Sequence, residues 1–241
     1  MKRIGHKGAD AIVPGNTPAS FDAALEAGVD MIEFDVLPVD YREPETTPLV
    51  LAHDYGHDLA TVPTLDEGLA YLASPAFDGI EFDVDLKVPG YERRVVEALR
   101  EHDLVERTLI SSQHMRSLTA VRAVEPRLRL GWSVPRVRHD YTQSNLWLIP
   151  ALFGLAVLRR ALPGRAVKAL GAKHCDALMV HHRLVSRELV QAVERAGGEL
   201  YVWTVDDAAT IRRLEAMGVA AIITNDPRLF DAPSEARTSP R

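Results

Sequence analysis

Short apolar segments typical of β-strands alternate with helix-like segments along almost the whole chain. The strand-like segments are residues 3–6, 31–36, 79–87, 107–113, 127–134, 176–181, 199–205 and 219–225. Helical patterns follow most of them, as at 91–101, 115–124, 186–195 and 207–217. Such alternation favours a mainly parallel sheet with right-handed crossovers. Eight units in a chain of this length predict the α/β class and a single (β/α)8 TIM barrel.

The alternative is an open, doubly wound sheet, and two features argue against it. No GxGxxG sequence opens a helix, as dinucleotide-binding sheets of that kind require. Polar or aromatic side chains also recur where the predicted strands end, which is where barrel enzymes place their chemistry. These strand-end residues are His6, Asp35, Lys87, Ser112, Trp132, His181, Trp203 and Asn225.

Composition narrows the class of protein further. Residues 1–231 are predicted to form one domain and the small, polar residues 232–241 a disordered tail. The net charge of −6 gives no electrostatic reason to expect a nucleic-acid partner. The single cysteine, Cys175, excludes an intrachain disulfide, and the N-terminus lacks a signal-peptide pattern. We therefore expect a cytoplasmic protein.

The most unusual strand pattern is GIEFDVDLK at residues 79–87. Its apolar side chains alternate with Glu81, Asp83, Asp85 and Lys87, so one face of the predicted strand is fully charged. Charges are rarely buried without a partner, and such a face requires a metal ion, a partner or water. We expect this strand to border a metal-assisted active site.

A second strand carries carboxylates that face the same way. Glu33 and Asp35 are two residues apart, and with Asp85 they would form a set of three oxygen ligands suited to Mg²⁺ or Ca²⁺. Ion pairs with Lys87 or Lys7 are the alternative, and spacing alone leaves both open.

Two histidines, His6 and His53, each end an apolar extended run. A histidine at a strand end is often only a hydrogen-bonding structural residue. Two histidines beside a carboxylate cluster favour proton transfer, because histidine titrates near neutrality.

Taken in order, these residues resemble the glycerophosphodiester phosphodiesterase family. The matching motifs span roughly 4–230 and are His6-Lys7-Gly8, Pro14-Gly15-Asn16-Thr17, Glu33-Phe34-Asp35-Val36, His53-Asp54, Asp85-Leu86-Lys87, Trp203-Thr204-Val205 and Thr224-Asn225-Asp226-Pro227. The resemblance implies a barrel enzyme with one divalent cation that hydrolyses glycerophosphodiesters to glycerol 3-phosphate and an alcohol. The roles it implies are metal ligands for Glu33, Asp35 and Asp85, general acid and base for His6 and His53, and substrate binding for Lys7, Lys87 and Trp203.

The chain also departs from the family pattern. The family usually has arginine at Lys7, glutamate at Gly15 and glutamate at Asp85, so a phosphate-binding cation and a ligand survive but one carboxylate is lost. Asp83 stands where an uncharged side chain is usual, which suggests that it shares the metal or pairs with Lys87.

An apolar segment, residues 146–158, has no charge and lies in an insertion at 140–172 on the expected catalytic face. It is too short to span a bilayer. A barrel helix and an interfacial segment that contacts a membrane or a lysolipid are both open, and the second would make the protein a lysophospholipase D. A catalytically silent phosphodiester-binding barrel is a further alternative. A sugar-phosphate aldolase is not supported, because no Schiff-base lysine or set of metal-binding histidines lies deep in the strands.

Overall fold

The computed structural model describes residues 1–56, 58–135 and 148–232, and it confirms the predicted TIM barrel. Its strands follow the order β1-β9-β8-β7-β6-β5-β4-β2, and pairing between β1 and β2 closes the ring. Every barrel pairing is parallel. The barrel strands are β1 (Lys2–Gly5), β2 (Met31–Pro38), β4 (Glu81–Leu86), β5 (Thr108–Ser112), β6 (Arg129–Val134), β7 (Ala177–His181), β8 (Glu199–Trp203) and β9 (Ala221–Thr224).

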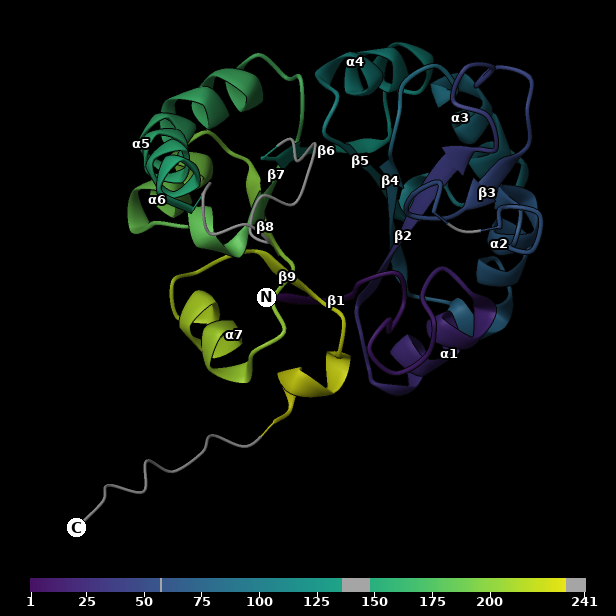
Figure 1. Ribbon diagram of the computed structural model, residues 1–241, viewed down its shortest axis with the longest axis horizontal. Coiled ribbons are helices and arrows are strands. Elements are labelled where there is room, and N and C mark those ends of the chain that lie inside the picture. Colours follow the sequence, from purple (N-terminus) through teal and green to yellow (C-terminus); the bar gives the residue numbers. More distant parts are fainter. Residues whose placement is uncertain (57, 136–147, 233–241) are drawn as a thin grey trace.

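The helices lie around the outside of the barrel, as Figure 1 shows. They are α1 (Pro18–Glu26), α2 (Leu65–Leu72), α3 (Glu92–Glu101), α4 (Met115–Val124), α5 (Leu148–Gly171), α6 (Arg187–Arg195) and α7 (Ala208–Glu215). The sequence explains where α1 begins, because Thr17 accepts a hydrogen bond from the backbone of Ser20 and Pro18 occupies the first turn. The start of α1 was therefore visible in the sequence.

The extended run after residue 48 forms a short ninth strand, β3 (Leu49–Leu51), which is not part of the closed ring. It pairs antiparallel with the end of β2, with Val36 opposite Leu51. This pairing brings the residues that follow β3, His53 and Asp54, back to the mouth of the barrel.

Two apolar layers and a charged base hold the barrel together. One layer lies between strands and helices, and the other fills the barrel interior with Ile4, Met31, Leu109, Ala177, Met179, Tyr201, Ala221 and Ile223. At the amino-terminal ends of the strands, Glu81 accepts hydrogen bonds from Lys2 at 2.7 Å and from Arg129. These two cations neutralise the first carboxylate of β4, and the remaining charges of this strand lie deeper or at the opposite end.

The predicted insertion is only partly described, since residues 140–147 lie outside the described residues, as do residues 233–241 of the predicted tail. The remainder of the insertion forms α5, and its carboxyl-terminal half packs into the core through Leu162, Ala166 and Leu170. Within the described chain, every helix is too short or too polar to cross a bilayer. The interfacial role of residues 146–158 stays a prediction.

Candidate active site

Three carboxylates meet at the carboxyl-terminal ends of β2 and β4. The register of these parallel strands sets Asp35 opposite Asp85 and Glu33 opposite Asp83. One oxygen from each of Glu33, Asp35 and Asp85 lies within 4.8 Å of the others. Glu33 and Asp35 are buried, and the side chain of Asp85 is only 14% exposed. The structure thus brings together the three carboxylates that the sequence suggested as metal ligands.

Asp35 is held by a residue that the sequence analysis did not single out. The Asn16 side chain donates to Asp35 Oδ2 at 2.9 Å and accepts from the Asp35 backbone N–H at 3.0 Å. Asn16 has a φ of 58°, a left-handed conformation that asparagine tolerates better than most residues. The Asn16 amide thus holds Asp35 through both its nitrogen and its oxygen. The remaining lone pairs of the Asp35 carboxylate point away from Asn16, toward the other carboxylates.

Lys87 is the positive charge at the cluster. Its ammonium ion-pairs with Asp35 Oδ1 and lies 2.6 Å from Asp85 Oδ2. Burial alone would lower the pKa of Lys87, but Asp35, Asp85 and Glu33 outweigh it and raise that pKa well above its ordinary value. Burial also favours a raised pKa at Asp35, but Lys87 and the two histidines hold it below its ordinary value.

The donor set fits a divalent cation. Burial and then the charge of Asp35 raise the pKa of Glu33 well above its ordinary value, so one ammonium does not compensate all three carboxylates. A hard cation bound among these oxygens would supply the missing positive charge. Glu33 Oε2 is already fixed by the backbone N–H of Lys7 at 2.8 Å, and this bond orients the carboxylate for such a role.

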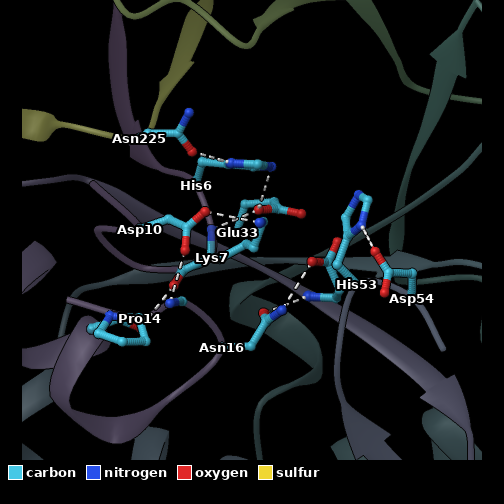
Figure 2. Close-up of polar contacts among 12 residues, drawn as sticks. His6, Lys7, Asp10, Pro14, Asn16, Glu33, His53, Asp54 and Asn225 are labelled. Carbon is cyan, nitrogen blue, oxygen red and sulfur yellow. Dashed lines mark hydrogen bonds and ion pairs between the residues drawn. The ribbon is translucent and has the colours of Figure 1, made fainter. Parts of the chain in front are cut away.

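His6 is oriented by a hydrogen bond with Asn225, the residue that follows β9 (Figure 2). The Asn225 amide nitrogen donates to Asp206 at 2.7 Å, which turns the amide oxygen of Asn225 toward His6 Nδ1 at 2.5 Å. Nδ1 must then carry the ring proton, and Nε2 is left as an acceptor facing Glu33 at 3.8 Å. Desolvation lowers the pKa of His6, which favours this neutral form.

His53 has a different environment. Its side chain is 50% exposed, and its Nδ1 lies 3.2 Å from Asp54 Oδ2 (Figure 2). The two histidines therefore border the same site in different environments. His6 is desolvated and hydrogen-bonded to an amide, whereas His53 is near solvent and beside a carboxylate.

A cavity of about 160 Å³ joins these groups. Its walls include six of the predicted site residues, namely His6, Glu33, His53, Asp85, Lys87 and Trp203. Asp35 is fully buried behind this wall. The lining also includes Asp83, for which the sequence suggested two roles, and residues to which the sequence analysis assigned no role, namely Ser111, Gln113, Ser133, Met179, Thr204 and Ile223. They come from inward-facing positions or from the ends of several strands. The recurrence of polar residues at strand ends is therefore the sequence pattern that could have identified some of them.

Besides Asp35, Lys7 is the predicted site residue that does not line the cavity. Its ammonium pairs with Asp10 at 2.8 Å (Figure 2), and its backbone adopts a φ of 50°. Asp10 also accepts the backbone N–H of Gly15 at 2.9 Å, and a Cβ at Gly15 would lie 2.6 Å from this carboxylate. Asp10 thus occupies the space beside Gly15, where the family usually has a glutamate. The phosphate-binding role of Lys7 stays a prediction.

Asp83 fulfils neither of the roles suggested for it by the sequence. Among the described residues, the three-carboxylate cluster does not include it, and the ion pairs of Lys87 go to Asp35 and Asp85. Asp83 is 1% exposed, and burial together with the charge of Asp85 raises its pKa to about 8.

Comparison with known proteins gives one consistent family. The model of the glycerophosphoryl diester phosphodiesterase family matches residues 6–37 and 53–229. A glycerophosphodiester phosphodiesterase of Caldanaerobacter subterraneus subsp. tengcongensis is 26% identical over 93% of each chain. Solved structures share the fold. The glycerophosphodiester phosphodiesterase of Agrobacterium tumefaciens has a TM-score of 0.69 at 22% identity, covering 97% of this chain and 100% of the other.

An Oleispira antarctica phosphodiesterase, solved in complex with the product sn-glycerol-3-phosphate, has a TM-score of 0.70 at 21% identity, covering 96% and 97% of the two chains. The family match spans most of this chain, including the strands that carry the acidic cluster and both histidines. The chain belongs to the glycerophosphoryl diester phosphodiesterase family.

Proposed function

We propose that this protein is a metal-dependent phosphodiesterase that hydrolyses glycerophosphodiesters to glycerol 3-phosphate and an alcohol. The observation that carries the proposal is the cavity itself, where three clustered carboxylates, one ammonium and two differently placed imidazoles converge. A phosphodiester is an anion that resists nucleophiles, so its oxygens must be neutralised while protons are moved on both sides of phosphorus.

The cation would be held by Glu33, Asp35 and Asp85, and their oxygen donors suit Mg²⁺ or Ca²⁺. When bound, it supplies positive charge that stabilises the phosphate oxygens as negative charge develops. Lys87 supplies a second positive charge from the same wall of the cavity. Trp203 offers an apolar wall, and its ring packs edge-on against His181 at 5.3 Å.

The histidines divide the proton transfers. His6 keeps its proton on Nδ1, so Nε2 is available to accept the proton of the attacking hydroxyl. We assign the attacker as the substrate's own glycerol hydroxyl, which gives a cyclic phosphate that water then opens. His53 lies at the solvent-exposed mouth, where its Nδ1–H would donate a hydrogen bond to Asp54 and its protonated Nε2 would give a proton to the departing alkoxide.

The test is a release assay with glycerophosphocholine, glycerophosphoethanolamine and a lysophospholipid, each with Mg²⁺, Ca²⁺ and EDTA. We expect activity that EDTA abolishes and that falls by about 10²–10⁴-fold in both His6→Ala and His53→Ala. His102→Ala is the matched control, because His102 pairs with Asp66 on the outside of the barrel and should retain activity. Undiminished turnover in EDTA, or in both site variants, would refute the mechanism.

The same assay decides between substrate classes. The described residues line a cavity of about 160 Å³, a volume suited to a small polar diester, which favours a soluble substrate. Preferential hydrolysis of the lysophospholipid would instead support the lysophospholipase D alternative and a lipid contact at residues 146–158. A chain that binds but never cleaves any of the three diesters would be the catalytically silent barrel.

A further inference from the structure

Asp83 is a buried carboxylate for which the mechanism above has no use. It faces the barrel interior on β4, one inward-facing step deeper than Asp85, and it forms part of the cavity lining. Neither of its carboxylate oxygens has a hydrogen bond of good geometry among the described residues, and the neighbouring Ser111 hydroxyl offsets only part of the effect of burial on its pKa. Burying such a group without well-formed hydrogen bonds is costly, so its presence at this position requires an explanation.

The nearby charged groups do not provide that explanation. The clustered ligand oxygens are those of Glu33, Asp35 and Asp85, and Lys87 is already shared by two of these residues. The cations at the base of the barrel are bound to Glu81, the preceding inward-facing residue of the same strand. Asp83 thus lies between two groups of paired charges and forms an ion pair with neither.

The surroundings of Asp83 are polar on one side of the cavity. Ser111 on β5 and Ser133 on β6 line the same wall, whereas Met179 and Ile223 line the apolar side. Carboxylate and serine oxygens accept hydrogen bonds from hydroxyl groups. The small volume of the cavity excludes a long chain from this depth.

We propose that Asp83 is a specificity-determining residue that accepts a hydrogen bond from the terminal hydroxyl of the substrate's glycerol moiety. This inference rests on the proposed function, because it takes the bound diester from there. With the phosphate held between Lys87 and the histidines, the glycerol end points down toward Asp83 and the alcohol end toward the open mouth. The site then selects substrates by their glycerol moiety and accepts different alcohols on the other side of the phosphate.

The test removes the hydrogen bond from either side. Wild type and Asp83→Leu are assayed with glycerophosphocholine, with glycerophosphoethanolamine and with an analogue of glycerophosphocholine that lacks only the terminal hydroxyl. We expect Asp83→Leu to lose about 10–100-fold in kcat/KM on both natural diesters, because the terminal hydroxyl is then buried without a hydrogen-bond partner. On the deoxy analogue, wild type should be as slow as the variant, and Asp83→Leu should cause no further loss.

Equal losses on the parent and deoxy substrates would overturn the proposal, because a general structural role weakens both. A loss confined to glycerophosphoethanolamine would also overturn it, since the ammonium would then be the donor. Asp83→Asn, which keeps an acceptor oxygen, should retain more activity than Asp83→Leu. Unchanged cation affinity in both variants, measured by calorimetry, should accompany these results, and a large change would overturn the proposal.

A binding measurement separates this proposal from the proposed function. We expect wild type to bind glycerol 3-phosphate more tightly than inorganic phosphate, and Asp83→Leu to erase that difference. If wild type hydrolyses no diester but shows this preference, the proposed reaction fails while the glycerol site stands. If wild type binds both anions equally, the glycerol site fails even where diester hydrolysis is observed.

Discussion

Replacing Lys87 with methionine tests the electrostatic balance of the site most directly. The Lys87 ammonium lies between Asp35, which is fully buried, and Asp85, whose side chain is 14% exposed. Lys87→Met keeps most of the aliphatic volume and removes the charge. In the variant, the Asp35 and Asp85 carboxylates would lose the ammonium that both of them pair with. They would then face each other and Glu33 without it.

The magnitude follows from the burial of these groups. Removing one partner of a buried ion pair costs about 3–5 kcal/mol of unfolding free energy, because the remaining charge stays desolvated. For a domain of this size, that loss lowers the thermal midpoint by roughly 6–20 °C. A divalent cation at one hundred times its Kd stabilises the folded state by about 2.7 kcal/mol. We expect saturating Mg²⁺ or Ca²⁺ to rescue the variant by more than it stabilises wild type, since the cation then supplies the only positive charge among the carboxylates.

Thermal unfolding in EDTA and in saturating cation measures both effects. Lys2→Met is the matched control, because Lys2 pairs with Glu81 at the other end of β4 and both side chains are about 30% exposed. This exposed pair should contribute less than about 1 kcal/mol, with no dependence on cation. Lys87→Arg, which keeps the charge, should be more stable than Lys87→Met. A Lys87→Met loss that is identical in EDTA and in cation would refute the reasoning that the three carboxylates form the cation site.

Three further predictions concern two residues that orient site side chains and one buried carboxylate that should destabilise the fold. Asn16→Ala removes both bonds to Asp35 and should weaken cation affinity by about 10–100-fold in a calorimetric titration, and an unchanged affinity would exclude the orienting role. Asn225→Ala frees the His6 ring and should lower kcat by about 10²-fold with little change in cation affinity, whereas a changed KM at constant kcat would contradict a role in proton transfer. Asp83→Leu should raise the unfolding free energy by about 1–3 kcal/mol in urea titrations, because no hydrogen bond of good geometry within the described chain offsets the burial of this carboxyl group; destabilisation would show that its contact with Ser111 is structural.

The acidic cluster was predictable because it depends on periodic patterns. Glu33 and Asp35 share one face of a strand, Asp85 lies on another, and parallel strands in register bring equivalent ends together. The barrel followed from the same alternation. Both histidines could be selected because each ends an extended run, and the family resemblance gave them roles that the patterns alone did not.

The supporting residues could not be found in this way. Asn16 and Asp206 lie in loops, and their importance depends on through-space contacts between segments far apart in the chain. The left-handed backbone of Asn16 is hinted at by its position after Pro14-Gly15, but nothing local indicates that its partner is Asp35. The pairing of Lys7 with Asp10 and the isolation of Asp83 likewise depend on which neighbours happen to be within reach.

The barrel joins its first and last strands, and this has a consequence for how the protein gains activity as it folds. β1 pairs with β9 beside the amino terminus (Figure 1), and the hydrogen bonds that orient His6 come from Asn225, just beyond β9. The acidic cluster, in contrast, needs only β2 and β4, which are neighbours along the barrel and close in the chain. The geometry of the carboxylates and the orientation of His6 therefore depend on different strand pairings, and only the second requires the ring to close. Turnover should report ring closure, because a chain without its last strand would lack the hydrogen bond that orients His6.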